Sequence, residues 1–183
     1  MTTSLHRQFV AVGGPKGSGK SAVLKQALSI LPGFKIISFG NWLMKQSRQE
    51  LHADFPDLDI QNKNILRKKF EKEIISLTRS YQVILDMHFG EFEEGGYPCV
   101  VPKTLEQRFT HIVLLTASAS AIQQRRLNDH KERRIDLISI HLNILGERLL
   151  YNNLCKKSHV KHSVFLNNDL DKTTRELVQF LSN

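Results

Sequence analysis

A short glycine-rich run near the N-terminus has the residue types and the spacing of a phosphate-binding loop (P-loop). Gly14-Pro15-Lys16-Gly17-Ser18-Gly19-Lys20-Ser21 fits the pattern G-x-x-x-x-G-K-[ST] and stands between a strand-like apolar run and a helical period. In such a loop the glycines let backbone N–H groups point at phosphate oxygens, and the lysine adds a point charge near the β and γ phosphates. A turn that only joined a strand to a helix would not need the lysine and the hydroxyl together. We therefore predict that ATP binds through Gly14, Lys16, Gly17, Ser18, Gly19, Lys20 and Ser21.

A carboxylate and an imidazole follow a later apolar run, Val83-Ile84-Leu85. Asp86 ends this run, where a magnesium-binding acid is expected, and Ser21 and Asp86 are the predicted ligands of Mg²⁺. Aspartates also end strands as turn formers, but the P-loop favours metal binding. His88 would project from the same side as Asp86 if the extended backbone continues. A contact with substrate and an ordinary loop histidine are equally compatible with its position.

Four arginines lie within or next to a densely charged segment, residues 128–136. Phosphoryl transfer develops negative charge on the group that moves, and arginines closing over it supply bidentate contacts and exclude water. The segment is therefore predicted to be a short lid, and its catalytic arginines are predicted to be Arg125, Arg126, Arg133 and Arg134. For any single one of them a solvated position near a helix C-terminus is a competing interpretation, because cations are favoured there.

The elements that must position these residues alternate along the chain. Apolar runs predict strands at 9–12, 35–39, 82–86, 111–116 and 160–166, and helical periods lie between them. Runs that are apolar at every position favour a parallel sheet covered on both faces. We expect an α/β fold of the P-loop NTPase type, with a parallel five-stranded sheet, helices on both faces and a small arginine-rich lid. The stripe Ile138, Leu142, Leu145 and Leu149 is expected to face the core, although an interface in an oligomer is the alternative.

Composition limits the classes of protein that fit. A chain of 183 residues is expected to form a single domain, with no membrane-spanning run and no leader, so the cytosol is the default compartment. Two cysteines without C-x-x-C spacing argue against a cysteine-built zinc site. The net charge of +8 favours anionic partners, either nucleotides or RNA.

The chain resembles the archaeal-type adenylate kinases and, more distantly, the nuclear eukaryotic adenylate kinase branch associated with ribosome assembly. The likeness rests on the P-loop, on Ser38-Phe39-Gly40, on Asp86-Met87-His88, on Gly96-Tyr97, and on Arg125-Arg126-Leu127-Asn128-Asp129 with Arg133, Arg134 and Asp136. The resemblance implies a helical acceptor-side insertion at about 41–80 and an acceptor pocket lined by Phe39, Gly40, Asn41 and His88. The family usually has an arginine between its two acceptor-side helices. Residues 51–60 contain none, and Arg48 or Arg67 is the available replacement.

The resemblance implies reversible phosphoryl transfer from Mg-ATP to AMP without a covalent intermediate. Two other functions stay open beside that of an adenylate kinase. One is a P-loop kinase for another small acceptor, because this scaffold serves many substrates. The other is an ATPase that acts as a nucleotide switch with RNA or ribosomal partners. A P-loop protein that binds nucleotide only structurally, or not at all, is a third possibility, against which the intact Lys20, Ser21 and Asp86 count.

Overall fold

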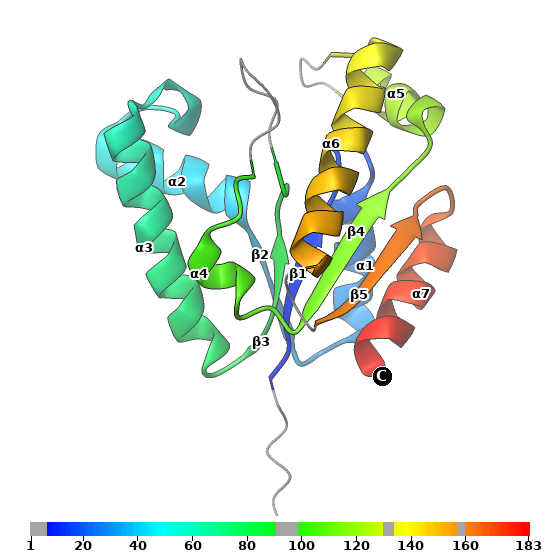
Figure 1. Cartoon of the computed structure of the whole chain (residues 1–183), viewed down its shortest axis with the longest axis horizontal. Helices are drawn as coiled ribbons and strands as arrows, with labels where there is room; N and C mark the ends of the chain where they lie inside the picture. The colour runs from blue at the N-terminus through cyan, green and yellow to red at the C-terminus, as the bar shows by residue number, and fades with distance from the viewer. Residues whose placement is uncertain (1–6, 91–98, 130–133, 157–159) are drawn as a thin grey trace, which may run out of the picture.

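A parallel sheet of five strands forms the centre of the computed structural model, which describes residues 7–90, 99–129, 134–156 and 160–183 (Figure 1). The strand order is β2-β3-β1-β4-β5, and every neighbouring pair is parallel. The strands are β1 (Phe9–Gly13), β2 (Phe34–Ser38), β3 (Gln82–Asp86), β4 (His111–Thr116) and β5 (Lys161–Leu166). This arrangement confirms the predicted α/β fold with five parallel strands.

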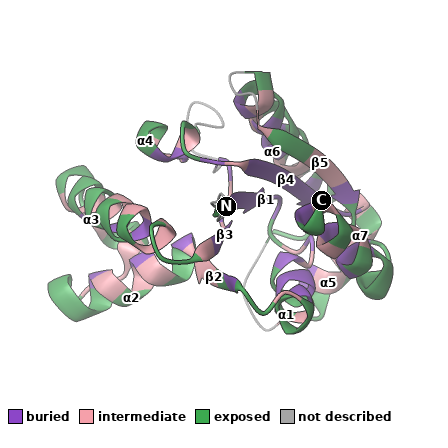
Figure 2. Ribbon diagram, turned by 90° about the horizontal axis from the view of Figure 1, so that it is seen from below, coloured by how far each residue is buried: buried purple, intermediate pink, exposed green. Residues whose placement is uncertain are grey.

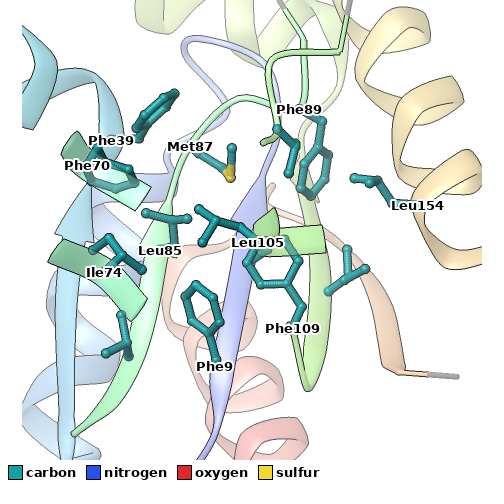
Figure 3. Close-up of a cluster of buried hydrophobic side chains, with 14 of the residues drawn as sticks. Phe9, Phe39, Phe70, Ile74, Leu85, Met87, Phe89, Leu105, Phe109 and Leu154 are labelled. Carbon is teal, nitrogen blue, oxygen red and sulfur yellow. The ribbon is translucent and has the colours of Figure 1, made fainter. Parts of the chain in front are cut away.

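Helices cover both faces of the sheet, because successive strand residues point to opposite sides. On one face, α1 (Lys20–Ile30) and α7 (Leu170–Ser182) pack against Val10, Val12 and Val113. On the other face, Phe9, Leu85 and their neighbours pack against a second set of helices (Figure 3). These helices are α2 (Phe39–Leu51), α3 (Ile60–Thr78), α4 (Lys103–Glu106) and α6 (Leu137–Lys156). Figure 2 shows the resulting pattern, with the inner strands β1, β3 and β4 buried and the outer sides of the helices exposed.

Two further elements complete the described parts of the chain. A 3₁₀ helix, η1 (Phe55–Asp57), lies between α2 and α3. The acceptor-side role expected for residues 41–80 stays a prediction. The helix α5 (Ala119–Leu127) follows β4 and packs on α6 through Ile122 and Ile140. None of the helices within the described ranges combines the length and the apolar character that a membrane crossing requires.

The prediction that Ile138, Leu142, Leu145 and Leu149 face the core is wrong. All four side chains are exposed, with exposed fractions that reach 76% for Ile138 and 54% for Leu145. The opposite side of α6 is buried, and it carries Ile140, Glu147, Tyr151 and Leu154. Both sides of the helix repeat apolar residues at spacings of three and four, so helical periodicity alone does not decide which side meets the sheet.

The parallel arrangement gathers the functional candidates at one edge of the sheet. The segments that follow β1, β3 and β4 all leave from the carboxyl ends of neighbouring strands (Figure 1). They carry the P-loop, Asp86 with His88, and the connection to α5, respectively. In open α/β sheets ligands bind beyond this edge.

Candidate active site

A cleft of about 1370 Å³ lies at the carboxyl edge of the sheet and is lined by the P-loop and by residues of α2 and α3. Most of the sequence-predicted site residues line it together: Lys16, Gly17, Ser18, Gly19, Lys20, Ser21, Phe39, Gly40, Asn41, Asp86 and His88. The tertiary structure thus brings the predicted ATP-binding loop and the predicted acceptor residues to one cavity.

The P-loop depends on glycine where the backbone turns most sharply. Gly14 has a φ of 144°, and a Cβ atom there would lie 2.0 Å from the carbonyl oxygen of Leu115. Gly19 has a φ of 88°, and its Cβ would lie 2.3 Å from Nδ2 of Asn167. Side chains are therefore excluded at both positions, and the backbone is free to present its N–H groups to an anion.

Lys20 begins α1, and its ammonium group is folded back onto the P-loop. Its Nζ donates a hydrogen bond of 2.5 Å to the carbonyl oxygen of Gly14, and the side chain is buried. Burial raises the pKa of Asp86 and lowers that of His88; the charge of Lys20 opposes the rise at Asp86 and adds to the fall at His88. A cation thus stands where the loop would hold phosphates.

Asp86 and Ser21 supply oxygen atoms of the kind that Mg²⁺ prefers. Burial raises the pKa of Asp86, and the nearby charges of Lys20 and His88 oppose this rise. The described residues contain no cluster of three or more His, Cys, Asp or Glu side chains that could hold a metal by themselves. This donor set suits Mg²⁺ that is shared between one or two protein oxygens and the phosphates of ATP, and with the glycine-built P-loop it fits Mg-ATP.

His88 is held from behind by a fully buried carboxylate that sequence reasoning missed. Oε1 of Glu147, on α6, lies 3.0 Å from Nδ1 of His88, and Oε2 accepts a hydrogen bond of 3.0 Å from the backbone N–H of Phe89. Burial lowers the pKa of His88, as does Lys20, while Glu147 opposes the shift. The available signal was an acidic residue on the helical face that also carries Ile140, Tyr151 and Leu154.

Arg125 contacts the outer side of the P-loop. Its Nη1 donates to the carbonyl oxygen of Ser18 at 2.9 Å, and its Nη2 donates to the carbonyl oxygen of Asn167 at 2.7 Å. Asn167, which follows β5, donates from Nδ2 to the same Ser18 carbonyl at 2.8 Å. Asn167 is a second residue that sequence reasoning missed, since nothing local marks it as a neighbour of the loop.

Arg126 is buried and joins the P-loop to the end of the charged segment. Its Nε and Nη2 donate to the carbonyl oxygen of Lys16 at 3.0 and 2.8 Å, and its Nη1 donates to the carbonyl oxygen of Arg134 at 2.7 Å. The side chain of Arg134 is exposed, and Arg133 lies outside the described residues. Contact of these four arginines with a transferring phosphoryl group stays a prediction.

On the acceptor side, Phe39 belongs mainly to the core and Gly40 and Asn41 to the surface of the cleft. Phe39 is 6% exposed, and its ring centroid lies 4.7 Å from that of Phe70. Gly40 and Asn41 are exposed in the first turn of α2. Of the four predicted acceptor residues, Gly40, Asn41 and His88 therefore offer polar groups at the cleft, and recognition of an acceptor by them stays a prediction.

Cations from α3 line the same side of the cleft: Lys63, Arg67 and Lys68. Nε of Arg67 is buried and has no hydrogen-bond partner among the described residues, and its guanidinium carbon lies 5.7 Å from the ring centroid of Phe55. Arg48, by contrast, forms a bidentate pair with Asp54 at 2.5 and 3.1 Å. Of the two arginines offered by the sequence, Arg67 is the one that lines the cleft.

The strand order, the P-loop after β1 and the acid at the end of β3 define the P-loop kinase fold. A solved structure of shikimate kinase from Bacteroides thetaiotaomicron is similar in fold, with a TM-score of 0.62 and 15% sequence identity over 95% of this chain and 98% of that chain. Residues 12–141 match the family described as AAA domain, so the chain belongs to that family. The search of curated proteins found no match.

Proposed function

We propose that this protein is a nucleoside monophosphate kinase that transfers the γ-phosphoryl group of Mg-ATP to AMP. The observation that carries the proposal is that the P-loop and cations of α3 line the same cleft. A nucleoside monophosphate is an anion, and its phosphate needs charged donors when it approaches the triphosphate.

The described side chains have distinct roles in this proposal. The P-loop backbone and Lys20 would bind the ATP phosphates, and Ser21 and Asp86 would hold Mg²⁺, which neutralises the charge between the β and γ phosphates. Arg67 would bind the acceptor phosphate, because its buried Nε has no hydrogen-bond partner among the described residues. Its guanidinium can bind a phosphate through two parallel N–H groups.

A kinase for another small anionic acceptor is the second candidate. It is favoured by the absence of an arginine from residues 51–60 and by the fold shared with a shikimate kinase. The cationic side of the cleft fits a carboxylate or a phosphate, so the acceptor must be identified by experiment.

The test is product analysis with Mg-ATP and each nucleoside monophosphate, shikimate and other small anionic acceptors in turn, beside a reaction without acceptor. We expect ATP and AMP to yield ADP, and we expect Lys20→Ala to lower the rate by about 100-fold or more, since a charge that stabilises the transferring group is removed. Formation of product only with shikimate or another non-nucleotide acceptor would favour the second candidate. Acceptor-independent hydrolysis would favour the ATPase switch.

Arg67→Ala and Arg79→Ala form a matched pair for the acceptor side. Both arginines belong to the α3 region, but Arg79 is an exposed residue at the end of the helix. The loss of a charge-assisted contact by Arg67→Ala should raise the KM for AMP about tenfold, with the KM for ATP and the Arg79→Ala kinetics unchanged. Equal effects of the two substitutions would remove Arg67 from the acceptor site.

A further inference from the structure

Glu147 is a charged side chain in a place that would suit an apolar residue. It lies on the buried side of α6, between Ile140 and Tyr151, and is 0% exposed. Removing a carboxylate from water costs several kcal/mol, and apolar residues of similar volume are often at least as stabilising at such positions. Stability alone therefore does not account for a carboxylate here.

The two oxygens of Glu147 are both used, and the two donors differ in kind. Oε2 accepts from the backbone N–H of Phe89, a main-chain group that cannot rotate on its own. Oε1 accepts from the imidazole of His88, a side chain that could otherwise rotate. The first hydrogen bond fixes the carboxylate, and the fixed carboxylate then fixes the ring.

The ring that Glu147 holds lines the cleft. His88 is one of the residues around the cavity, next to Asp86. Its Nδ1 is taken by Glu147, and none of the hydrogen bonds formed by described residues uses Nε2. Nε2 is therefore the ring nitrogen left for a ligand.

We propose that Glu147 is a positioning residue of the acceptor site, which holds His88 through Nδ1 so that Nε2 contacts the acceptor. The proposal rests on the proposed function, and it deepens it by naming the chemistry recognised. A carboxylate only accepts hydrogen bonds, so Nδ1 carries the hydrogen and Nε2 of the neutral ring offers a lone pair. The group recognised on the acceptor is therefore a hydrogen-bond donor, such as a hydroxyl or an amino group.

Glu147→Gln tests this with almost no change in shape. The N–H of Phe89 is a donor only, so it must meet the oxygen of the new amide, and the amide NH₂ then faces Nδ1 of His88. Nδ1 is forced to accept, and Nε2 becomes a donor. We expect kcat/KM for AMP to fall about tenfold, with the KM for ATP unchanged, because one acceptor hydrogen bond is replaced by two opposed donors. Glu176→Gln, on the exposed side of α7, is the matched control.

A double-mutant cycle with His88→Ala separates positioning from a structural role. If Glu147 acts through His88, adding Glu147→Gln to His88→Ala leaves kcat/KM for AMP unchanged. If Glu147 serves only the packing of α6, Glu147→Gln lowers kcat/KM by the same factor in the wild type and in His88→Ala. Its effect on the melting temperature is then also the same in the two proteins. That result would overturn the proposal.

A ¹⁵N spectrum of the histidine rings makes the result independent of turnover. His88 is assigned by the signals lost in His88→Ala, at about pH 8, where histidine is neutral. In the wild type the ring hydrogen of His88 should be on Nδ1, and in Glu147→Gln it should be on Nε2. Addition of AMP should shift the Nε2 signal of the wild type. The proposal would be overturned if the ring ¹⁵N signals of His88 were the same in the wild type and in Glu147→Gln. It would also be overturned if AMP were phosphorylated without shifting the Nε2 signal. If AMP is not phosphorylated but Glu147→Gln still moves the ring hydrogen of His88 from Nδ1 to Nε2, the proposed function fails and the positioning of His88 by Glu147 stays supported.

Discussion

The carbonyl groups of the P-loop need partners as much as its N–H groups need a ligand. Arg126 holds the Lys16 carbonyl, and Arg125 holds the Ser18 carbonyl. These hydrogen bonds fix the two carbonyls from outside the cleft, and within the loop the N–H of Ser18 donates to the carbonyl oxygen of Pro15 at 3.1 Å. At the scale of single residues, these two arginines therefore organise the loop before any nucleotide binds.

Arg126→Ala should weaken ATP and ADP binding about tenfold, since two hydrogen bonds from a charged donor to the loop are lost. Calorimetric titration of both nucleotides checks this, with the exposed Arg175→Ala of α7 as control. A large fall in kcat at unchanged nucleotide affinity would instead favour direct contact of Arg126 with the transferring phosphoryl group.

At the scale of elements, α6 has two apolar sides with different environments. Ile140 is fully buried against Ala117 and Ile122, whereas Leu145 is half exposed. Their chemistry is similar, and only the packing of the helix on the sheet separates them.

Ile140→Ala should therefore lower the free energy of unfolding by about 2–5 kcal/mol, the usual cost of truncating a buried isoleucine. Leu145→Ala should change it by about 0.5 kcal/mol or less, as exposed positions do. Urea denaturation at two protein concentrations measures both. An equal, concentration-dependent loss for Leu145→Ala would show that the outer side of α6 is covered in an oligomer.

At the scale of the whole molecule, His111 couples folding to pH. It begins β4, its Nδ1 pairs with Oγ1 of Thr110 at 2.9 Å, and its buried Nε2 has no hydrogen-bond partner within the described residues. Burial lowers the pKa of His111, and the charge of Lys161 lowers it further. Around the ordinary pKa of histidine, the unfolded chain therefore binds a proton at this position more readily than the folded chain does. The free energy of unfolding consequently rises with pH in that range.

The melting temperature should accordingly fall as the pH drops below about 6.5, the ordinary pKa of histidine, and it should be nearly level above that pH. His111→Phe should flatten the acid side of this profile, which scanning calorimetry measures. The flattening should be partial, because the pKa of His88 is also lowered by burial. An unchanged profile would show that His111 does not titrate during unfolding.

Local patterns in the sequence were sufficient for the fold and for the loop that is predicted to bind ATP. The inner strands β1, β3 and β4 were recognised because fully apolar runs reflect burial on both faces. The P-loop was recognised because its backbone conformation demands glycines at set spacings. Such features depend on residues a few positions apart.

Tertiary structure alone decided how distant residues meet. The bond between His88 and Glu147 joins positions 59 apart in sequence, and that between Asn167 and Ser18 joins positions 149 apart. The same holds for the buried side of α6, for the Arg125 and Arg126 contacts with the loop, and for the place of Arg67 in the cleft. No periodicity encodes these pairings, because they arise only when the order of the strands and the packing of the helices bring separate segments to the same edge of the sheet.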